Sequence, residues 1–176
     1  MAVVVLDAGH GGSDLGATYQ GRQEKDDTLA LTLAVGRLLA EDPDIDVVYT
    51  RETDTYDTPL VKAQKANAAN ADYFVSIHRN STPVPSTYSG VETLVYSKGT
   101  RAEMLARNIA SALSAIGFAD LGTTESKILT VLKRSNMPAV IVEVGYIDTP
   151  KDNAFLDENF LAVARAIADG IKKTVQ

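Results

Sequence analysis

Short apolar segments rich in valine and isoleucine recur along the chain, and most of them stop at a polar residue. The four clearest are residues 3–6, 45–51, 72–78 and 138–145. Segments of this length and β-branched composition, bounded by Gly, Pro or Asp, are typical of strands buried on both faces of a parallel sheet. Such strands need helices on both sides, which restricts the chain to an α/β architecture.

The segments between the strands have helical character. Residues 24–41 carry leucines at helical spacing behind an acidic first turn, and residues 58–71 begin with Thr58 and Pro59, a typical helix start. Further helices are predicted at 100–116 and 159–173, and further strands at 90–97 and 127–132. We therefore expect one domain over residues 1–176, with a three-layer α/β fold. Its sheet is expected to be twisted and mostly parallel, with about six strands and helices on both faces.

Charge and composition exclude several classes of partner. The chain has 17 Lys+Arg against 23 Asp+Glu and a net charge of −6, whereas nucleic-acid binders usually present a basic face. It has neither a long apolar span nor the pattern of a secretory leader at its start, so we expect no membrane partner and no signal peptide in this chain. With no cysteine, any metal must be held by His, Asp or Glu. We expect a monomer by default.

The two histidines occupy equivalent places in the predicted fold. His10 follows the first strand and His78 ends the strand at 72–78. Ligand sites of open α/β sheets lie beyond the carboxyl ends of the strands, which meet at one edge. A single histidine is more often structural, but two at the same edge predict a shared site.

Glu24 and Asp7 are the acids best placed to join the histidines. Glu24 begins the helix that follows the first strand, where an acid also offsets the helix dipole. Two imidazoles and one carboxylate, with a fourth position left to water, are typical of catalytic zinc. Asp7 is the competing ligand, or alternatively an acceptor for an imidazole N–H.

Glu143 lies within the apolar segment at 138–145, where an unpaired charge is costly. It could form a structural ion pair with Arg51 or Lys127. Alternatively, it could act as a general base and acid beside a zinc-activated water, since burial and a nearby cation together would set its pKa.

Three common motifs are absent. The glycine-rich GHGGSDLG lacks the G-K-[ST] ending of a phosphate-binding loop, and neither H-E-x-x-H nor G-x-S-x-G occurs. Nucleotide binding, the commonest zinc-peptidase helix and a serine nucleophile elbow are therefore disfavoured.

Four segments together resemble the zinc-dependent N-acetylmuramoyl-L-alanine amidases of the type-3 amidase family. They are VVLDAGHGGSDLGA with Glu24 following, TRETD at 50–54, ADYFVSIHRNS at 71–81 and MPAVIVEVGYIDTPKDNAFL at 137–156. The resemblance spans almost the whole chain in order. It implies His10, Glu24 and His78 as ligands of one Zn²⁺ and Glu143 as the catalytic glutamate.

The same resemblance implies a peptidoglycan hydrolase that acts in the cell wall, like autolysins and phage endolysins. Its reaction would be cleavage of the amide between the lactyl group of N-acetylmuramic acid and L-alanine of the stem peptide. Two departures stand out: Arg79 occupies a position where alanine is common, and Lys62 one where arginine is common. A long cation at Arg79 is expected beside the metal crevice, whereas Lys62 is expected to be structural.

Two other functions remain open from the sequence. The same zinc site could hydrolyse a different amide, as in a peptidase or a deacetylase. A non-catalytic wall-binding module with this fold would be expected to lack a ligand or Glu143, and all four residues are present.

Overall fold

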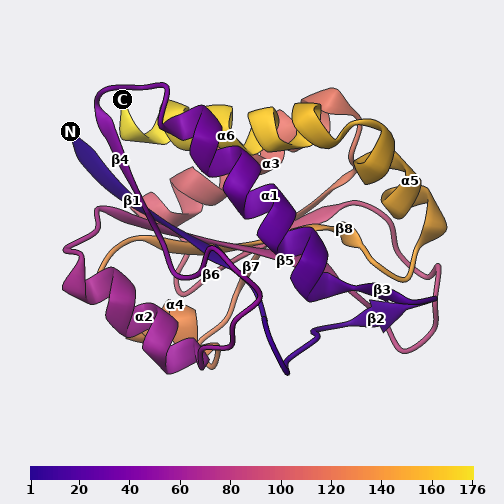
Figure 1. The fold of residues 1–176 in the computed structure, drawn as a ribbon. Coiled ribbons are helices and arrows are strands. Elements are labelled where there is room, and N and C mark those ends of the chain that lie inside the picture. The colour runs from indigo at the N-terminus through magenta and orange to yellow at the C-terminus, as the bar shows by residue number, and fades with distance from the viewer.

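A twisted six-stranded sheet forms the centre of the computed structural model, which describes residues 1–176 (Figure 1). Its strands, in spatial order, are β4 (Ile45–Tyr49), β1 (Ala2–Ala8), β5 (Tyr73–Asn80), β8 (Ala139–Tyr146), β6 (Val91–Val95) and β7 (Asp120–Glu125). The first four run parallel, while β6 pairs antiparallel with β8 and parallel with β7. The mostly parallel α/β sheet expected from the sequence is confirmed.

Helices cover the two faces of the sheet unequally. Three helices of 16 residues each pack on one face: α1 (Glu24–Leu39), α3 (Arg101–Ile116) and α6 (Phe160–Val175). The other face carries only the shorter α2 (Pro59–Ala68) and α4 (Thr130–Arg134). Two smaller elements complete the fold, the hairpin of β2 (Thr18–Tyr19) with β3 (Arg22–Gln23) and the helix α5 (Pro150–Glu158). None of the helices combines the length and apolarity needed to span a bilayer.

The hydrophobic core follows this asymmetry. The face under α1, α3 and α6 holds a cluster of 28 buried residues, whereas the face under α2 and α4 holds a cluster of eight. The small cluster draws on the amino-terminal halves of the parallel strands, at Val5, Phe74 and Ile141. Successive residues on one face of a strand are two apart, so this face continues into Asp7, His78 and Glu143. The thinly covered face thus changes from apolar to polar toward the carboxyl ends of the strands.

One predicted strand is wrong. Residues 127–129 form a loop with exposed Ile128, and residues 130–132 begin α4, whose Val131 and Leu132 pack in the small core. A short apolar run has no periodicity that separates a strand from one turn of helix. The strand instead lies at Asp120–Glu125, an exposed edge strand whose polar sequence carries no alternating pattern.

Candidate metal and catalytic site

Three residues converge at the carboxyl edge of β1 and β5. His10, Glu24 and His78 each offer one ligand atom, and these three atoms lie within 4.8 Å of one another. His10 Nε2 is 3.0 Å from Glu24 Oε2, and His78 Nδ1 is 3.1 Å from Glu24 Oε1. The structure therefore brings together the three residues that the sequence analysis grouped, and places the glutamate between the two imidazoles.

Asp14 fixes the ring of His10, and the sequence analysis missed it. Its Oδ2 lies 2.9 Å from His10 Nδ1, while its Oδ1 accepts a hydrogen bond from the Gly16 amide. A pair of backbone hydrogen bonds between Gly11 and Asp14 holds the turn closed. With Nδ1 engaged, His10 presents Nε2 to Glu24, which is the usual way a carboxylate orients a metal-binding imidazole. An acid four residues after a histidine was the available signal.

Two glycines allow the site to be this compact. A Cβ atom at Gly9 would lie 2.4 Å from His78 Cε1, closer than real Cβ contacts. At Gly16 it would lie 2.6 Å from both Glu24 Oε2 and His10 Cδ2, on a backbone with φ of +68°. The glycines of the loop after β1 therefore allow close packing around the cluster, since positions 9 and 16 have no room for side chains.

Glu24 is more than a helix-dipole acid. Glu24 is only 3% exposed, and its two carboxylate oxygens accept hydrogen bonds from the backbone amides of Ala17 and Arg79. Burial opposes ionisation, but hydrogen bonds and charges from His10 and His78 hold the pKa of Glu24 below its usual range. Against burial, Glu24 and Asp14 in turn raise the pKa of His10 to about 8. Without a metal, the cluster is a fixed carboxylate between two basic imidazoles.

Glu143 lies on the next strand, without a partner. It stands in register with His78 on β5, and its Oε2 is buried with no hydrogen bond. Burial raises the pKa of Glu143 to about 7; the carboxylates of Glu24 and Glu92 act in the same direction and His78 opposes them. The alternative of a structural ion pair is wrong for both of the partners considered, Arg51 and Lys127. Arg51 donates to backbone carbonyls, among them that of Ala8, and Lys127 binds Ser97 and a backbone carbonyl.

Asp7 does not belong to the cluster and does not contact an imidazole. It is 1% exposed and accepts hydrogen bonds from the hydroxyls of Thr50 and Ser76, and Lys62 Nζ lies 2.9 Å from its Oδ1. Lys62 also donates to the backbone carbonyls of Ala8 and His10, at 2.8 and 3.4 Å. The Lys62–Asp7 ion pair therefore stabilises the backbone that leads into His10.

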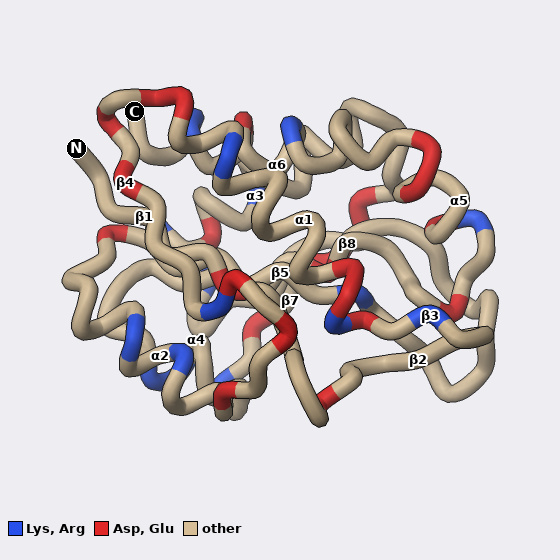
Figure 2. The backbone as a smooth tube through the Cα atoms, viewed as in Figure 1, with Lys and Arg blue, Asp and Glu red and all other residues tan.

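Arg79 points away from the crevice, which corrects the expectation of a cation beside the metal. Its side chain is fully buried and binds Asp27 on α1 and Asn153 on α5. Figure 2 shows basic segments of β3 and β5 close to the acidic start of α1, where Arg22 and Arg79 both pair with Asp27. Neighbouring residues on a strand face opposite sides of the sheet, so with His78 in the site Arg79 enters the opposite layer.

A cavity of about 150 Å³ opens beside the cluster. Its lining includes His10 and His78 and the apolar side chains of Leu129, Val131 and Ile141. The site therefore combines polar reactive groups with a small apolar wall, as small-molecule sites usually do.

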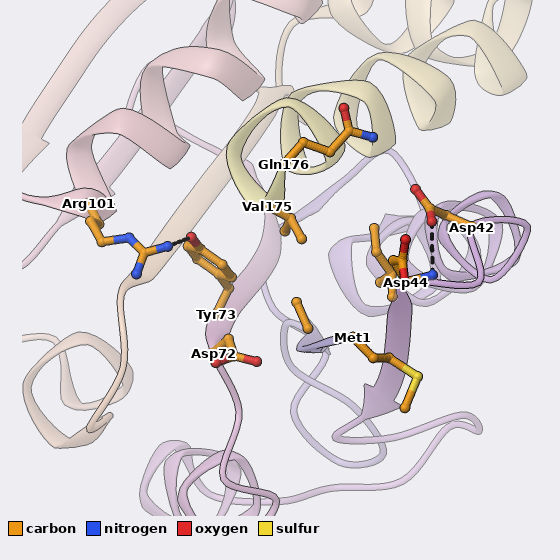
Figure 3. A pocket seen from close by; sticks show the side chains of 10 residues that line it. Met1, Asp42, Asp44, Asp72, Tyr73, Arg101, Val175 and Gln176 are labelled. Carbon is orange, nitrogen blue, oxygen red and sulfur yellow. Dashed lines mark hydrogen bonds between the residues drawn. The ribbon is translucent and has the colours of Figure 1, made fainter.

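A larger cavity, of about 380 Å³, lies at the opposite ends of the strands (Figure 3). It is lined by Asp42, Asp44 and Asp72, with Tyr73 hydrogen-bonded to Arg101 at its side. It contains no histidine, and its aspartates do not form a close cluster of three ligand atoms like that of His10, Glu24 and His78. Chemistry rather than size thus distinguishes the candidate site.

The fold and the cluster define a class: a three-layer α/β domain with a candidate site for one metal ion at the carboxyl edge of its sheet. Residues 4–173 match the family Amidase_3, described as N-acetylmuramoyl-L-alanine amidase. The chain belongs to this family.

Similar proteins include both phage and bacterial members. The chain is 38% identical over 175 residues to an endolysin of Bacillus phage SPP1, covering 96% of this chain and 64% of the relative. It is 35% identical over 178 residues to a sporulation-specific N-acetylmuramoyl-L-alanine amidase of Bacillus subtilis, covering 98% and 68%. The catalytic domain of CwlV from Paenibacillus polymyxa superposes with a TM-score of 0.90 at 38% identity, covering 98% and 97%. The chain thus spans about two thirds of these curated relatives and nearly all of the catalytic domain.

Proposed function

We propose that the protein is a zinc-dependent N-acetylmuramoyl-L-alanine amidase that acts on peptidoglycan in the bacterial cell wall. The bond cleaved is the amide between the lactyl group of N-acetylmuramic acid and L-alanine of the stem peptide. The observation that carries this proposal is the cluster of His10, Glu24 and His78, with unpaired Glu143 beside it, in a member of this family. The names of the relatives, an endolysin and a sporulation amidase, support the substrate and the location.

The donor set suits one zinc ion. Two imidazole nitrogens and one carboxylate oxygen are the ligands of many catalytic zinc sites. Zinc–nitrogen bonds of about 2.0–2.1 Å in a tetrahedron place ligand atoms about 3.3 Å apart, and the two closest pairs here are 3.0 and 3.1 Å apart. When bound, zinc supplies a Lewis acid that polarises a carbonyl and lowers the pKa of water.

The protein's own residues divide the remaining work. Asp14 holds His10 with Nε2 directed into the site, and backbone amides keep the Glu24 carboxylate in place. Glu143 takes a proton from the attacking water and returns it to the amine of the departing L-alanine. A carboxyl whose pKa is raised to about 7 suits both transfers near neutral pH.

Product analysis of digested peptidoglycan tests the proposal. Wild-type protein is expected to release stem peptides with new free N-terminal L-alanine, to lose this activity with a chelator and to regain it with zinc. Glu143→Gln is expected to keep one zinc per chain and to lose activity by about 10²–10⁴-fold, the range for general acid–base catalysis. Glu158→Gln, on the exposed end of α5, is the matched control and should retain activity.

Three results would contradict the proposal. An active Glu143→Gln enzyme would contradict the assignment of the proton transfers to Glu143. Free amino sugars or internal peptide termini as products would indicate a deacetylase or a peptidase with the same zinc site. Binding to the wall without release of peptide would indicate a non-catalytic wall-binding module.

A further inference from the structure

Glu92 is a glutamate of the site face that the proposed reaction does not use. It lies at the start of β6, directly across the antiparallel pair from Glu143 on β8. Residues opposite each other in a sheet point to the same face. His78, Glu143 and Glu92 therefore form one row across three neighbouring strands, on the face that α2 and α4 leave uncovered at this end.

The carboxylate of Glu92 is held in place from both sides. Asn80 Nδ2 on β5 donates to its Oε2 at 3.1 Å, and Thr124 Oγ1 on β7 donates to its Oε1 at 2.9 Å. Each carboxylate oxygen has two acceptor positions, so each retains one that these contacts leave open. No lysine or arginine forms an ion pair with Glu92, which is half-buried rather than covered. The group is thus an oriented acceptor that faces the site.

The order of His78, Glu143 and Glu92 across the sheet defines the direction along which we place a substrate. The scissile carbonyl belongs at the His10–Glu24–His78 cluster, and the leaving amine must be within hydrogen-bond reach of Glu143. Continuing in the same direction, the next strand is β6, about 4.8 Å further along the sheet. A peptide that continues from the amine in this direction passes over Glu92. Backbone N–H groups can bind an ionised carboxylate, whereas the carboxylates of a stem peptide are repelled by it.

We propose that Glu92, anchored by Asn80 and Thr124, is a substrate-binding residue that accepts hydrogen bonds from backbone N–H groups of the stem peptide beyond L-alanine. This inference rests on the proposed function and adds to it the side of the site that holds the leaving peptide. It also makes binding depend on peptide length, because the contact lies beyond the first residue.

Calorimetric binding to zinc-loaded Glu143→Gln protein, which should not turn over its ligand, tests the inference. The probes are N-acetylmuramoyl-tetrapeptide and N-acetylmuramoyl-L-alanine methyl ester. The second lacks the peptide beyond L-alanine and has no terminal carboxylate that Glu92 would repel. In the Glu143→Gln background, Glu92→Ala is expected to weaken binding of the long probe about tenfold or more, which is the effect of losing a hydrogen bond to a charged group. Binding of the short probe should not change. Adding Glu158→Ala, the matched control, should change neither.

Further variants keep the test decisive if Glu92→Ala folds poorly. Glu92→Gln keeps the side-chain shape and one acceptor oxygen, so it should give an intermediate loss for the long probe only. Thr124→Val removes one anchor and should give a smaller loss. The inference would be overturned if Glu92→Ala weakened binding of both probes equally, or weakened neither. The proposed function would still stand in that case, provided that the wild-type enzyme is active. A wild-type protein that neither binds nor cleaves muramyl peptides would overturn both.

Discussion

The buried carboxyl of Glu143 predicts a pH-dependent stability that substitution should abolish. Its pKa rises from 4.5 to about 7 on folding, because burial removes the carboxyl from water. The folded state therefore retains a proton that the unfolded state loses. The contribution to stability is fully present below pH 4.5 and is lost as the pH rises through about 7. At about 1.36 kcal/mol for each pH unit between these values, the loss is about 3 kcal/mol.

Glu143→Gln replaces the carboxyl with a neutral group of the same shape. In urea unfolding of metal-free protein, we expect equal free energies of unfolding for wild type and variant near pH 4.5. At pH 8 the variant should be more stable by about 3 kcal/mol. His10 and His78 titrate in both proteins, so the difference between the two curves reports on Glu143 together with its interaction with His78.

The control is Glu158→Gln, whose exposed carboxyl should give no pH-dependent difference from wild type. If Glu143→Gln were less stable than wild type at pH 8, or if the two curves ran parallel, the carboxyl would not be held in a desolvated environment. The reasoning that assigns it a pKa suited to proton transfer would then fail.

Two further predictions concern the residues that support the cluster. Asp14→Ala should weaken zinc binding roughly 10–100-fold in a chelator competition, because His10 loses the carboxylate that orients it; unchanged affinity would mean that the turn alone fixes the ring. Lys62→Met should lower the free energy of unfolding by about 3–5 kcal/mol in urea, because it leaves the Asp7 carboxylate buried without its cation. Adding Asp7→Asn should recover part of that loss, and strictly additive losses would show that the two residues are not coupled.

The strands β1, β5 and β8 were predictable because each is buried on both sides. Burial on both faces selects continuous β-branched segments such as residues 3–6 and 138–145, which are visible without any knowledge of their neighbours. The edge strand β7 was not predictable, because it is exposed and polar and owes its conformation to pairing with β6. The same limit applies to residues 130–132, where only packing against α2 and the small core selects a helix.

The residues of the candidate site also differ in whether they could be predicted from the sequence. His10 and His78 were found because parallel strands deliver their carboxyl ends to one edge, so position along the sequence implies proximity. Glu92 lies at the amino end of β6, and it reaches that edge only because β6 runs antiparallel to β8. The sequence alone thus determined the parallel strands and the residues at their ends, since the apolar composition of a segment and the residue that follows it are local properties. Tertiary structure decided the register and direction of the remaining strands, which place Glu92 beside Glu143 and turn Arg79 away from the site.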